Sequence, residues 1–456
     1  MTTKLTLSPC CLVVLSLLAA TARAQSPTIL DVAPIFSAYP VNYALLTDPK
    51  TSTQYVAYYN ADRQITLASR SLSSHEWKTY TLPDGPAGQP PTKTAWDSHN
   101  ALALALDSAG QLHLSGNYHA APLLYYRTTS PGDITSLAPL NKMVGAREAS
   151  ATYPRFLQGP NHELVFAYRD GRSGQGDDIY NLYHPDTQTW TRLLDQPLLD
   201  GEKKSNAYSV GPISGPDGFY HLTWVWRNSP DCSSNHDLSY ARSKDLVHWE
   251  NAAGKSLTLP ITLSPDTIVD PVPVKGGMIN NNTLIGFDPQ HRPVLAYHKN
   301  TDEGTQLFLA RFDTAANKWQ LAQQSHWNYT WNFSGNGTMI FDIRLHPPET
   351  LADGRFVATA THAKFGDVGF TIDPVTLQPT GPYAPPLLLP AALMKPESTF
   401  PGMTVNTVPD SGQSPDPRTR YLLRWETLAE NRDQPRRGQL PPPTMLRLIT
   451  LPRSPQ

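Results

Sequence analysis

The sequence contains only three cysteines, and two of them, Cys10 and Cys11, lie in an N-terminal apolar run. Cys232 is the one cysteine outside that run, so intramolecular disulfide bonds cannot stabilise the remainder of the chain. After residue 24, no stretch approaches the roughly 18 consecutive apolar residues that a membrane-spanning helix needs. Helical apolar periodicity is missing as well. The sequence therefore excludes a disulfide-rich scaffold and disfavours a helical bundle.

Charge is also scarce. Charged residues make up 17% of the chain and the net charge is −2. We therefore do not expect a general nucleic-acid binder or a protein of anionic membrane surfaces, although a local basic patch could still meet an acidic substrate. The expected protein is a monomer that binds neither nucleic acid nor membrane.

Residues 1–24 are predicted to be a secretory signal peptide. Lys4 precedes an apolar run over Leu12–Ala20, and Ala22-Arg23-Ala24 before Gln25 fits a small-residue cleavage site. Neither early cysteine lies beside a plausible lipoprotein cleavage site. The mature protein is expected to be secreted, to the medium or the periplasm, with residues 25–456 forming one domain.

Proline (44 residues), glycine (28) and tyrosine (20) are abundant, which favours many short strands joined by turns. A turn followed by a strand recurs with a period of roughly 60 residues, which is typical of β-propeller blades. The predicted first strands are 54–59, 112–116, 164–169, 220–227, 294–298 and 356–362. Several repeats then end on a tryptophan, namely Trp77, Trp190, Trp249 and Trp319. We predict an all-β, seven-bladed β-propeller, with six or eight blades still open and a set of β-sandwiches as the alternative.

Two further segments bear on the fold. Residues 445–451 are predicted to form the last strand and to close the ring. Ser243–Trp249 resembles the Asp-box turn of sialidase-like propellers, although it lacks the usual glycine and is one residue short. A similar string occurs in five-bladed glycosidases, so the segment indicates a structural hairpin and no particular activity.

Polar side chains gather where predicted strands begin and end. His99 and His119 lie at the two ends of a predicted hairpin over residues 96–119, and Tyr153, Arg169 and Tyr208 lie at strand ends in the units that follow. In a propeller, the ends of successive inner strands meet at one mouth of the central channel. We therefore expect these five side chains to share a cleft.

These residue types suit proton abstraction beside a sugar carboxylate. Arg169 would neutralise the carboxylate, because a guanidinium binds carboxylates in bidentate fashion and stays charged. His99 would take the proton or contact the carboxylate, and Tyr153 would protonate the leaving oxygen. If Arg169 or a protonated histidine lowered its pKa, Tyr153 could also act as the base. His119 and Tyr208 would position the sugar or share the proton transfer.

Each assignment has a structural alternative. His119 could cap a hairpin turn. Tyr153 and Tyr208 could be core aromatics with a polar tip. Arg169 could form an ion pair with the adjacent Asp170.

Several motifs in order resemble the propeller polysaccharide lyases that cleave ulvan. They are Trp96–Asn100, Asn117–His119, Thr152–Phe156, Ala167–Asp170, Leu222–Arg227 and Asn235–Tyr240. The resemblance extends from about residue 35 to 450, and the spacings of 20 residues from His99 to His119 and 16 from Tyr153 to Arg169 match the short type of these enzymes.

This resemblance implies a secreted seven-bladed propeller that cleaves an acidic, sulfated algal polysaccharide at its uronic acid residues. Cleavage by β-elimination would leave a 4,5-unsaturated uronyl end. The implied catalytic residues are His99, Tyr153, Arg169 and His119. Asn100, Tyr208 and Arg227 are expected to bind the substrate.

A second group of residues suggests a metal. Cys232 lies among three histidines, His221, His236 and His248, and a thiolate with several imidazoles is a typical zinc set. Four protein ligands would make the ion structural, because no position remains for water. The resembling lyases carry such a metal; a buried free cysteine is the alternative. Calcium is also possible in the family, and Asp177-Asp178 would be the candidate ligands.

Two other functions compete with a lyase. A sialidase or other propeller glycosidase would need paired carboxylates, or an arginine cluster with a nucleophilic tyrosine and its glutamate. The predicted cleft offers Asp97, Glu148 and Asp170 but no evident pair. A non-catalytic carbohydrate-binding propeller would keep the fold and need neither His99 nor Tyr153.

Overall fold

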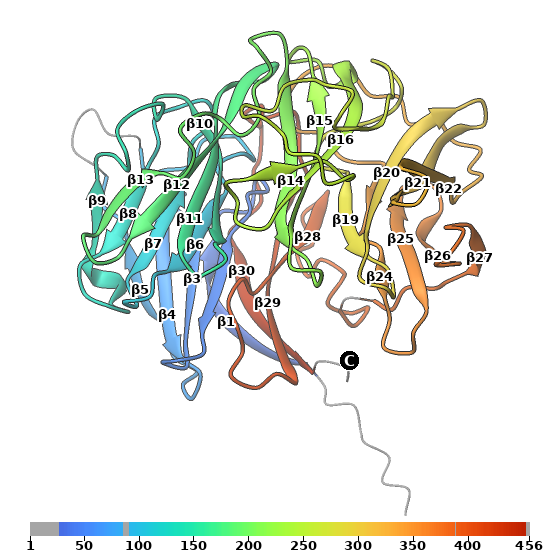
Figure 1. Ribbon diagram of the computed structural model, residues 1–456. Helices are drawn as coiled ribbons and strands as arrows, with labels where there is room; N and C mark the ends of the chain where they lie inside the picture. The colour runs from blue at the N-terminus through green and yellow to red at the C-terminus, as the bar shows by residue number, and fades with distance from the viewer. Residues whose placement is uncertain (1–26, 85–90, 388, 453–456) are drawn as a thin grey trace, which may run out of the picture.

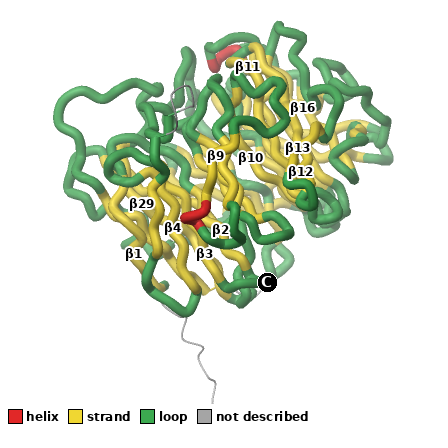
Figure 2. The backbone as a smooth tube through the Cα atoms, turned by 90° about the vertical axis from the view of Figure 1, so that its left-hand side faces the viewer, coloured by secondary structure: helices red, strands yellow, loops and turns green. Residues whose placement is uncertain are grey.

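The computed structural model of the protein describes residues 27–84, 91–387 and 389–452. The predicted signal peptide and its two cysteines lie outside the described residues. Within them, helix is confined to two short 3-10 segments, η1 (Ile134–Ser136) and η2 (Cys232–Ser234), and strands dominate (Figure 2). The all-β class predicted from the sequence is confirmed.

The described strands form six sheets, each built mainly of antiparallel neighbours. The first two sheets comprise β2 (Ala44–Asp48), β3 (Thr53–Tyr59), β4 (Ile65–Ser71) and β5 (Lys78–Thr81), then β6 (Leu102–Leu106), β7 (Leu112–Gly116), β8 (Tyr125–Thr128) and β9 (Leu137–Leu140). A nine-stranded sheet follows, with β10 (Ala151–Gln158), β11 (Leu164–Arg172), β12 (Gln175–His184), β13 (Thr189–Arg192), β14 (Asn206–Ser214), β15 (Tyr220–Arg227), β16 (Asn235–Ser243), β17 (Trp249–Glu250) and β18 (Ile268–Asp270).

Two more sheets follow along the chain, and the last one joins both ends. They comprise β19 (Leu284–Phe287), β20 (Pro293–Thr301), β21 (Gly304–Asp313) and β22 (Lys318–Gln323), then β23 (Ile343–Leu345), β24 (Glu349–Thr350), β25 (Phe356–His362), β26 (Gly366–Ile372) and β27 (Pro379–Pro382). The last sheet comprises β28 (Met403–Pro409), β29 (Thr419–Leu428), β30 (Thr444–Pro452) and β1 (Thr28–Ile35). All six strands predicted to open the repeats are present, as β3, β7, β11, β15, β20 and β25, but each is the second strand of its group, because β2, β6, β10, β14, β19 or β23 precedes it.

The burial of the strands explains why the sheets must stack. In β3, the consecutive residues Tyr55–Tyr59 are all buried, although successive side chains point to opposite faces of the sheet. Both faces of this sheet are therefore covered, whereas the outer strand β5 is largely exposed. Sheets buried on both faces and exposed at one edge are what radial packing around a centre produces.

The nine-stranded sheet combines two units. β10 to β13 form one antiparallel group and β14 to β17 another, and a single parallel pair, Gly176 with Asn206, joins them. If the groups are counted as two blades, the described sheets give seven. Because the pairing is continuous, the blade count stays a prediction.

The two ends of the described chain meet in one sheet. β30 lies between β29 and β1, and Thr28 pairs with Thr450. Figure 1 shows blue β1 running beside the red strands β29 and β30. The predicted last strand, 445–451, therefore joins the first and last segments, as expected for ring closure.

The first strands of successive sheets lie close to a common centre. β2 contacts both β6 and β28, and β6 contacts β10.

Among the described residues, no helix is long and apolar enough to cross a membrane.

The predicted Asp-box hairpin is confirmed as a structural turn. Asp245 Oδ1 accepts hydrogen bonds from the backbone N–H groups of Val247 and His248, and Trp249 is buried.

Candidate active site

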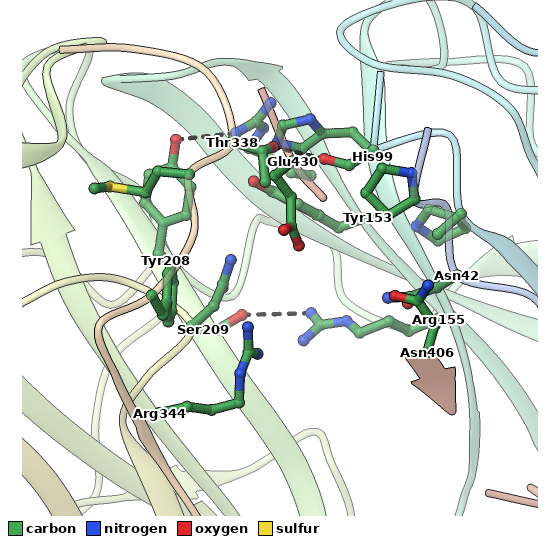
Figure 3. Close-up of a pocket in the computed structure, with 18 of the residues that line it drawn as sticks. Asn42, His99, Tyr153, Arg155, Tyr208, Ser209, Thr338, Arg344, Asn406 and Glu430 are labelled. Carbon is green, nitrogen blue, oxygen red and sulfur yellow. Dashed lines mark hydrogen bonds between the residues drawn. The ribbon is translucent and has the colours of Figure 1, made fainter. Parts of the chain in front are cut away.

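A cavity of about 460 Å³ lies where the first strands converge. Every sheet contributes to its lining, either from its first strand or from a connecting loop. The lining residues are Pro40, Asn42, Ser98, His99, Ala101, Tyr153, Pro154, Arg155, Arg169, Asp178, Ala207, Tyr208, Ser209, Asn281, Thr338, Met339, Phe341, Arg344, Asn406 and Glu430. Four of the residues predicted from the sequence, His99, Tyr153, Arg169 and Tyr208, therefore share one cavity. Figure 3 shows His99, Tyr153 and Tyr208 around it.

His99 and His119 share one carboxylate. Asp97 Oδ1 lies 2.7 Å from His99 Nδ1, and its Oδ2 lies 2.7 Å from His119 Nδ1. The two rings stack with centroids 3.8 Å apart. An ionised carboxylate only accepts hydrogen bonds, so both histidines carry a proton on Nδ1. When either imidazole is neutral, its Nε2 atom is therefore the acceptor.

Asp97 stays ionised. Burial raises the pKa of Asp97, but the hydrogen bonds and charges of His119 and His99 outweigh burial and hold that pKa well below its usual range. A second carboxylate, Asp433, lies 3.8 Å from His99 Nδ1 and comes from the segment between β29 and β30. His99 is thus held among acidic groups from two distant parts of the chain.

The hairpin that carries the histidines is fixed from the neighbouring sheet. The Tyr59 hydroxyl, at the end of β3, donates to Asn100 O at 2.6 Å and to Asn117 Oδ1 at 3.0 Å. Asn117 has a left-handed backbone, with φ of 64°, which asparagine tolerates better than most residues. These bonds connect the loop before β6 to the loop after β7, so His99 and His119 meet.

Tyr153 occupies an irregular position in β10. The register with β11 shifts between Thr152 and Arg155, and Tyr153 has a φ of 59°. A bulge of this kind redirects side chains, and a left-handed non-glycine residue is costly unless its surroundings impose it. Such strain is common at functional sites.

The environment of Tyr153 keeps its hydroxyl protonated. Its ring lies 5.5 Å from that of His99. Burial raises the pKa of Tyr153 well above its ordinary value, Tyr208 adds to this effect, and Arg169 and Arg227 offset only part of it. The pKa of Tyr153 is therefore not lowered beside Arg169, which was the condition for Tyr153 to act also as the base, because burial dominates.

Arg169 is a buried cation that lacks a carboxylate partner. Only 2% of the surface of Arg169 is exposed to solvent. Nη1 donates to the Tyr208 hydroxyl at 3.3 Å, Nη2 donates to Thr152 Oγ1 at 3.0 Å, and Nε has no partner in the described structure. No carboxylate of the described residues lies within 4.0 Å of it, whereas the adjacent Asp170 pairs with Arg147 at 2.8 Å. The alternative of an Arg169–Asp170 ion pair is therefore excluded.

Backbone shape makes room for this arginine. A Cβ on Gly176 would lie 2.9 Å from Arg169 Cδ and 2.2 Å from Asn206 Oδ1. Only glycine permits β12 to pass this closely. The guanidinium then lies over the ring of Tyr153, with Cζ 4.9 Å from the centroid.

Tyr208 and Arg227 complete the aromatic and cationic wall. The Tyr208 hydroxyl also bonds Ser173 Oγ at 2.7 Å, and its ring lies 5.2 Å from Arg227 Cζ. Arg227 itself is buried and donates to Ser229 O, Pro230 O and Asn280 Oδ1. It does not line the cavity, so its contact with the ring supports Tyr208 from behind.

Two other predicted residues lie outside the cavity lining. Asn100 is buried and its amide donates to Thr94 Oγ1 at 3.2 Å, which gives it a structural role in the loop. His119 bonds Asp97 and stacks on the His99 ring, and it does not line the cavity.

The predicted zinc ligands do not meet. On the β15–β16 hairpin, His221 pairs with Arg242 and His236 pairs with Trp226, which places these histidines roughly 16 Å apart along the strands. The His221 ring nitrogens bond Tyr240 and Asp217, and the His236 ring nitrogens bond Asp237 and Asn228.

The other two predicted ligands are separated as well. The His248 side chain is 87% exposed and bonds Asp245 in the Asp-box turn. Cys232 is buried, with Sγ 3.9 Å from Met339 Sδ. The predicted set His221, Cys232, His236 and His248 therefore does not fit one zinc ion.

The possible calcium pair is also committed elsewhere. Asp177 forms an ion pair with Arg147, and Asp178 accepts from Ser209 Oγ at 2.7 Å and faces Arg155 at 3.7 Å. Among the described residues, the one group of three His, Cys, Asp or Glu donors close enough to hold a metal is Asp97, His99 and His119. In this group, each Asp97 carboxylate oxygen lies 2.7 Å from a histidine Nδ1, which is a hydrogen-bond distance. Two ligand atoms bound to one zinc ion would be roughly 3.3 Å apart.

Sequence reasoning missed the roles of five charged residues at this site: Asp97 as the link between the histidines, Arg155, Arg344, Glu430 and Asp433. Asp97 and Arg155 lie within motifs that were already singled out, so their alternation with His99 and Tyr153 was an available signal. Arg344, Glu430 and Asp433 come from distant segments without a local motif.

A sequence model described as a BNR repeat-containing family member matches residues 53–327. A search of curated proteins finds no match. Among solved structures, the polysaccharide lyase Uly1 is similar with a TM-score of 0.61 at 14% identity, covering 94% of this chain and 99% of that one.

Two structures of a PL25 ulvan lyase are similar as well. One is bound to -[GlcA(1-4)Rha3S]- and has a TM-score of 0.58 at 13% identity; the other has a TM-score of 0.57 at 14% identity. Each match covers 88% of this chain and 93% of the other. At such identities the likeness establishes the fold, and it confirms the predicted propeller architecture.

Proposed function

The chain belongs to the BNR repeat-containing family, and from this membership, its fold and its cavity we propose that it is a polysaccharide lyase acting on ulvan. It would cleave this acidic, sulfated polysaccharide at uronic acid residues by β-elimination. The observation that carries the proposal is Arg169, a cation buried in the cavity wall without a carboxylate partner. A buried charge left unpaired is costly, and a substrate carboxylate would supply the missing counter-charge.

The elimination requires three actions at one sugar. A base removes the proton at C5, the resulting carbanion is stabilised through the carboxylate, and the oxygen at C4 leaves with a proton. Arg169 would hold the carboxylate, because its charge persists and its position is fixed by Tyr208 and Thr152. Of its five N–H donors, only one on each of Nη1 and Nη2 is used, and the buried Nε–H has no partner in the described structure.

His99 is the best candidate for the base. It lines the cavity, whereas His119 does not. Hydrogen bonding to Asp97 keeps the proton on Nδ1 and leaves Nε2 to accept the C5 proton. The imidazolium formed in this step would be stabilised by the same carboxylate.

Tyr153 would be the acid that protonates the C4 oxygen. Its raised pKa keeps the hydroxyl protonated at neutral pH, so it has a proton to give. The same direction disfavours a tyrosinate base. We therefore assign proton removal to His99 and proton donation to Tyr153.

We also propose that the protein acts outside the cytoplasm, on the basis of the secretory pattern in residues 1–24 and the polymeric substrate. No step is assigned to zinc, because the four predicted ligands do not meet.

The test is to incubate the purified protein with ulvan and to follow the ultraviolet absorbance of the new C4=C5 double bond. The proposal predicts rising absorbance with wild type and with Tyr220→Phe, an outer tyrosine whose hydroxyl bonds Gln158 O. New reducing ends without absorbance would indicate a glycoside hydrolase, for which Asp178 and Glu430 are the carboxylates in the cavity. Binding without either signal would indicate a carbohydrate-binding propeller.

A further inference from the structure

The cavity holds two arginines that the elimination does not use. Arg155 projects from β10 and Arg344 from β23, so they enter from different sheets, and both line the cavity. Figure 3 shows their side chains extending into the space beside Ser209, away from His99.

Arg344 is placed to face the cavity. Its neighbours in β23, Ile343 and Leu345, are buried, and alternation along the strand directs Arg344 to the opposite face. The residue is exposed, and its guanidinium lies over the Phe341 ring, with Cζ 5.3 Å from the centroid. Among the described residues it forms no ion pair within 4.0 Å.

Arg155 is held firmly but is only partly neutralised. Nη1 donates to Gly211 O at 2.6 Å and Nη2 donates to Ser209 Oγ at 3.4 Å. The carboxylate of Asp178 lies 3.7 Å away, while the buried Nε has no partner. Its guanidinium is therefore oriented in advance and retains donor capacity.

The side chains that line the cavity carry more positive than negative charge, whereas Asp97 and Asp433, which contact His99, lie outside this lining. Three guanidinium groups line the cavity, those of Arg155, Arg169 and Arg344, against two carboxylates, those of Asp178 and Glu430. A planar guanidinium matches the oxygens of sulfate or carboxylate in bidentate geometry.

We propose that Arg155 and Arg344 form a second anion subsite, which takes a negatively charged substituent on a sugar next to the one that Arg169 holds. This inference rests on the proposed function, since it assumes a charged polysaccharide in the cavity. The substituent is a sulfate ester or a second carboxylate, and the two share the same recognition chemistry.

The first experiment measures lyase kinetics for Arg344→Gln with native ulvan and with chemically desulfated ulvan. Arg344 is exposed and makes no ion pair, so its replacement should leave folding intact. We expect KM on native ulvan to rise about tenfold, as for loss of a charged hydrogen bond, with little change in kcat. Arg344→Lys should bind the polymer more tightly than Arg344→Gln but less tightly than wild type, because lysine keeps the charge and lacks the bidentate geometry of a guanidinium.

The matched control is Arg355→Gln, which removes an arginine from the turn before β25 of the same sheet, outside the cavity lining, where it pairs with Asp353. Its KM should equal that of wild type. If Arg344→Gln raises KM only on the sulfated polymer, the substituent is a sulfate ester; an equal rise on both polymers indicates a carboxylate. Unchanged KM on both polymers would overturn the subsite.

A second readout is independent of catalysis. Inorganic sulfate should raise the Tm of wild type and Arg355→Gln more than that of Arg344→Gln, at ionic strength matched with chloride. The comparison between variants removes the general stabilising effect of sulfate on folded proteins. If wild type cleaves no uronate polymer, the proposed function fails. The subsite is then tested by this difference in Tm alone: a smaller rise in Arg344→Gln supports it, and an equal rise overturns it.

Discussion

Replacing Asp97 by asparagine tests how the two histidines divide their roles. Asp97 Oδ1 accepts both the backbone N–H of His99, at 2.9 Å, and His99 Nδ1–H, at 2.7 Å, whereas Oδ2 faces only His119 Nδ1. An asparagine must keep its oxygen toward the two donors of His99, so its amide nitrogen will face His119. His119 then has to accept at Nδ1 and change tautomer, while His99 keeps its own and loses the negative charge beside it.

The size of the effect follows from this geometry. If His99 is the base, its Nε2 remains available and only the charge that stabilises the imidazolium is lost. A hydrogen bond to a charged group contributes about 1 to 2 kcal/mol more than a neutral one, which corresponds to a decrease of about 5- to 30-fold in kcat. His99→Ala should cost more, about 100-fold or above, because the proton acceptor itself is removed.

The assay is the initial rate of ultraviolet absorbance on saturating ulvan. The matched control is Asp217→Asn, which alters an Asp–His pair of similar geometry outside the cavity, at 2.9 Å from His221, and should leave kcat unchanged. Full activity of Asp97→Asn would refute the shared-carboxylate argument. A loss beyond about 1000-fold would transfer the base role to His119, whose tautomer changes.

Three further predictions follow from other contacts. Tyr153→Phe should lower kcat about 100-fold or more by removing the proton donor, with unchanged thermal unfolding, and retention of full activity would contradict the assignment. Burial raises the pKa of Asp245, but hydrogen bonds from His248 and the turn lower it overall to about 2. The stability that it contributes is therefore present above about pH 4 and lost as pH falls toward 2, so urea midpoints should fall less between pH 6 and pH 3 in Asp245→Asn than in wild type. Burial raises the pKa of the Cys232 thiol, so a thiol reagent should label Cys232 slowly until denaturant is added. A chelator should not change the Tm. Rapid labelling of the native protein, or a fall in Tm with chelator, would contradict the placement of Cys232.

The strand repeat was predictable because each unit carries its own local pattern. A turn, a run of β-branched and aromatic residues and a closing tryptophan are all encoded within one repeat, as at Tyr220–Arg227 and Trp249. The rule that inner strand ends converge then placed His99, Tyr153 and Arg169 together, and the structure brings them into one cavity.

The zinc set shows what sequence spacing cannot give. His221 and His236 are only 15 positions apart, yet the β15–β16 register puts them near opposite ends of the hairpin. Site residues from distant segments could not be predicted for a different reason. Asp433 reaches His99 only because the ring closes, and Arg344 enters the cavity from another sheet. The positive φ of Tyr153 depends on a bulge that only the pairing of β10 with β11 defines.

The claim that this propeller cleaves by elimination is tested most directly by weighing its products. A purified ulvan oligosaccharide is digested, and the masses of the two fragments from one cleavage are summed. Elimination adds no water, so the account predicts a sum equal to the mass of the parent, with the unsaturated uronyl end on one fragment. A sum greater by one water, with no unsaturated end, would contradict it.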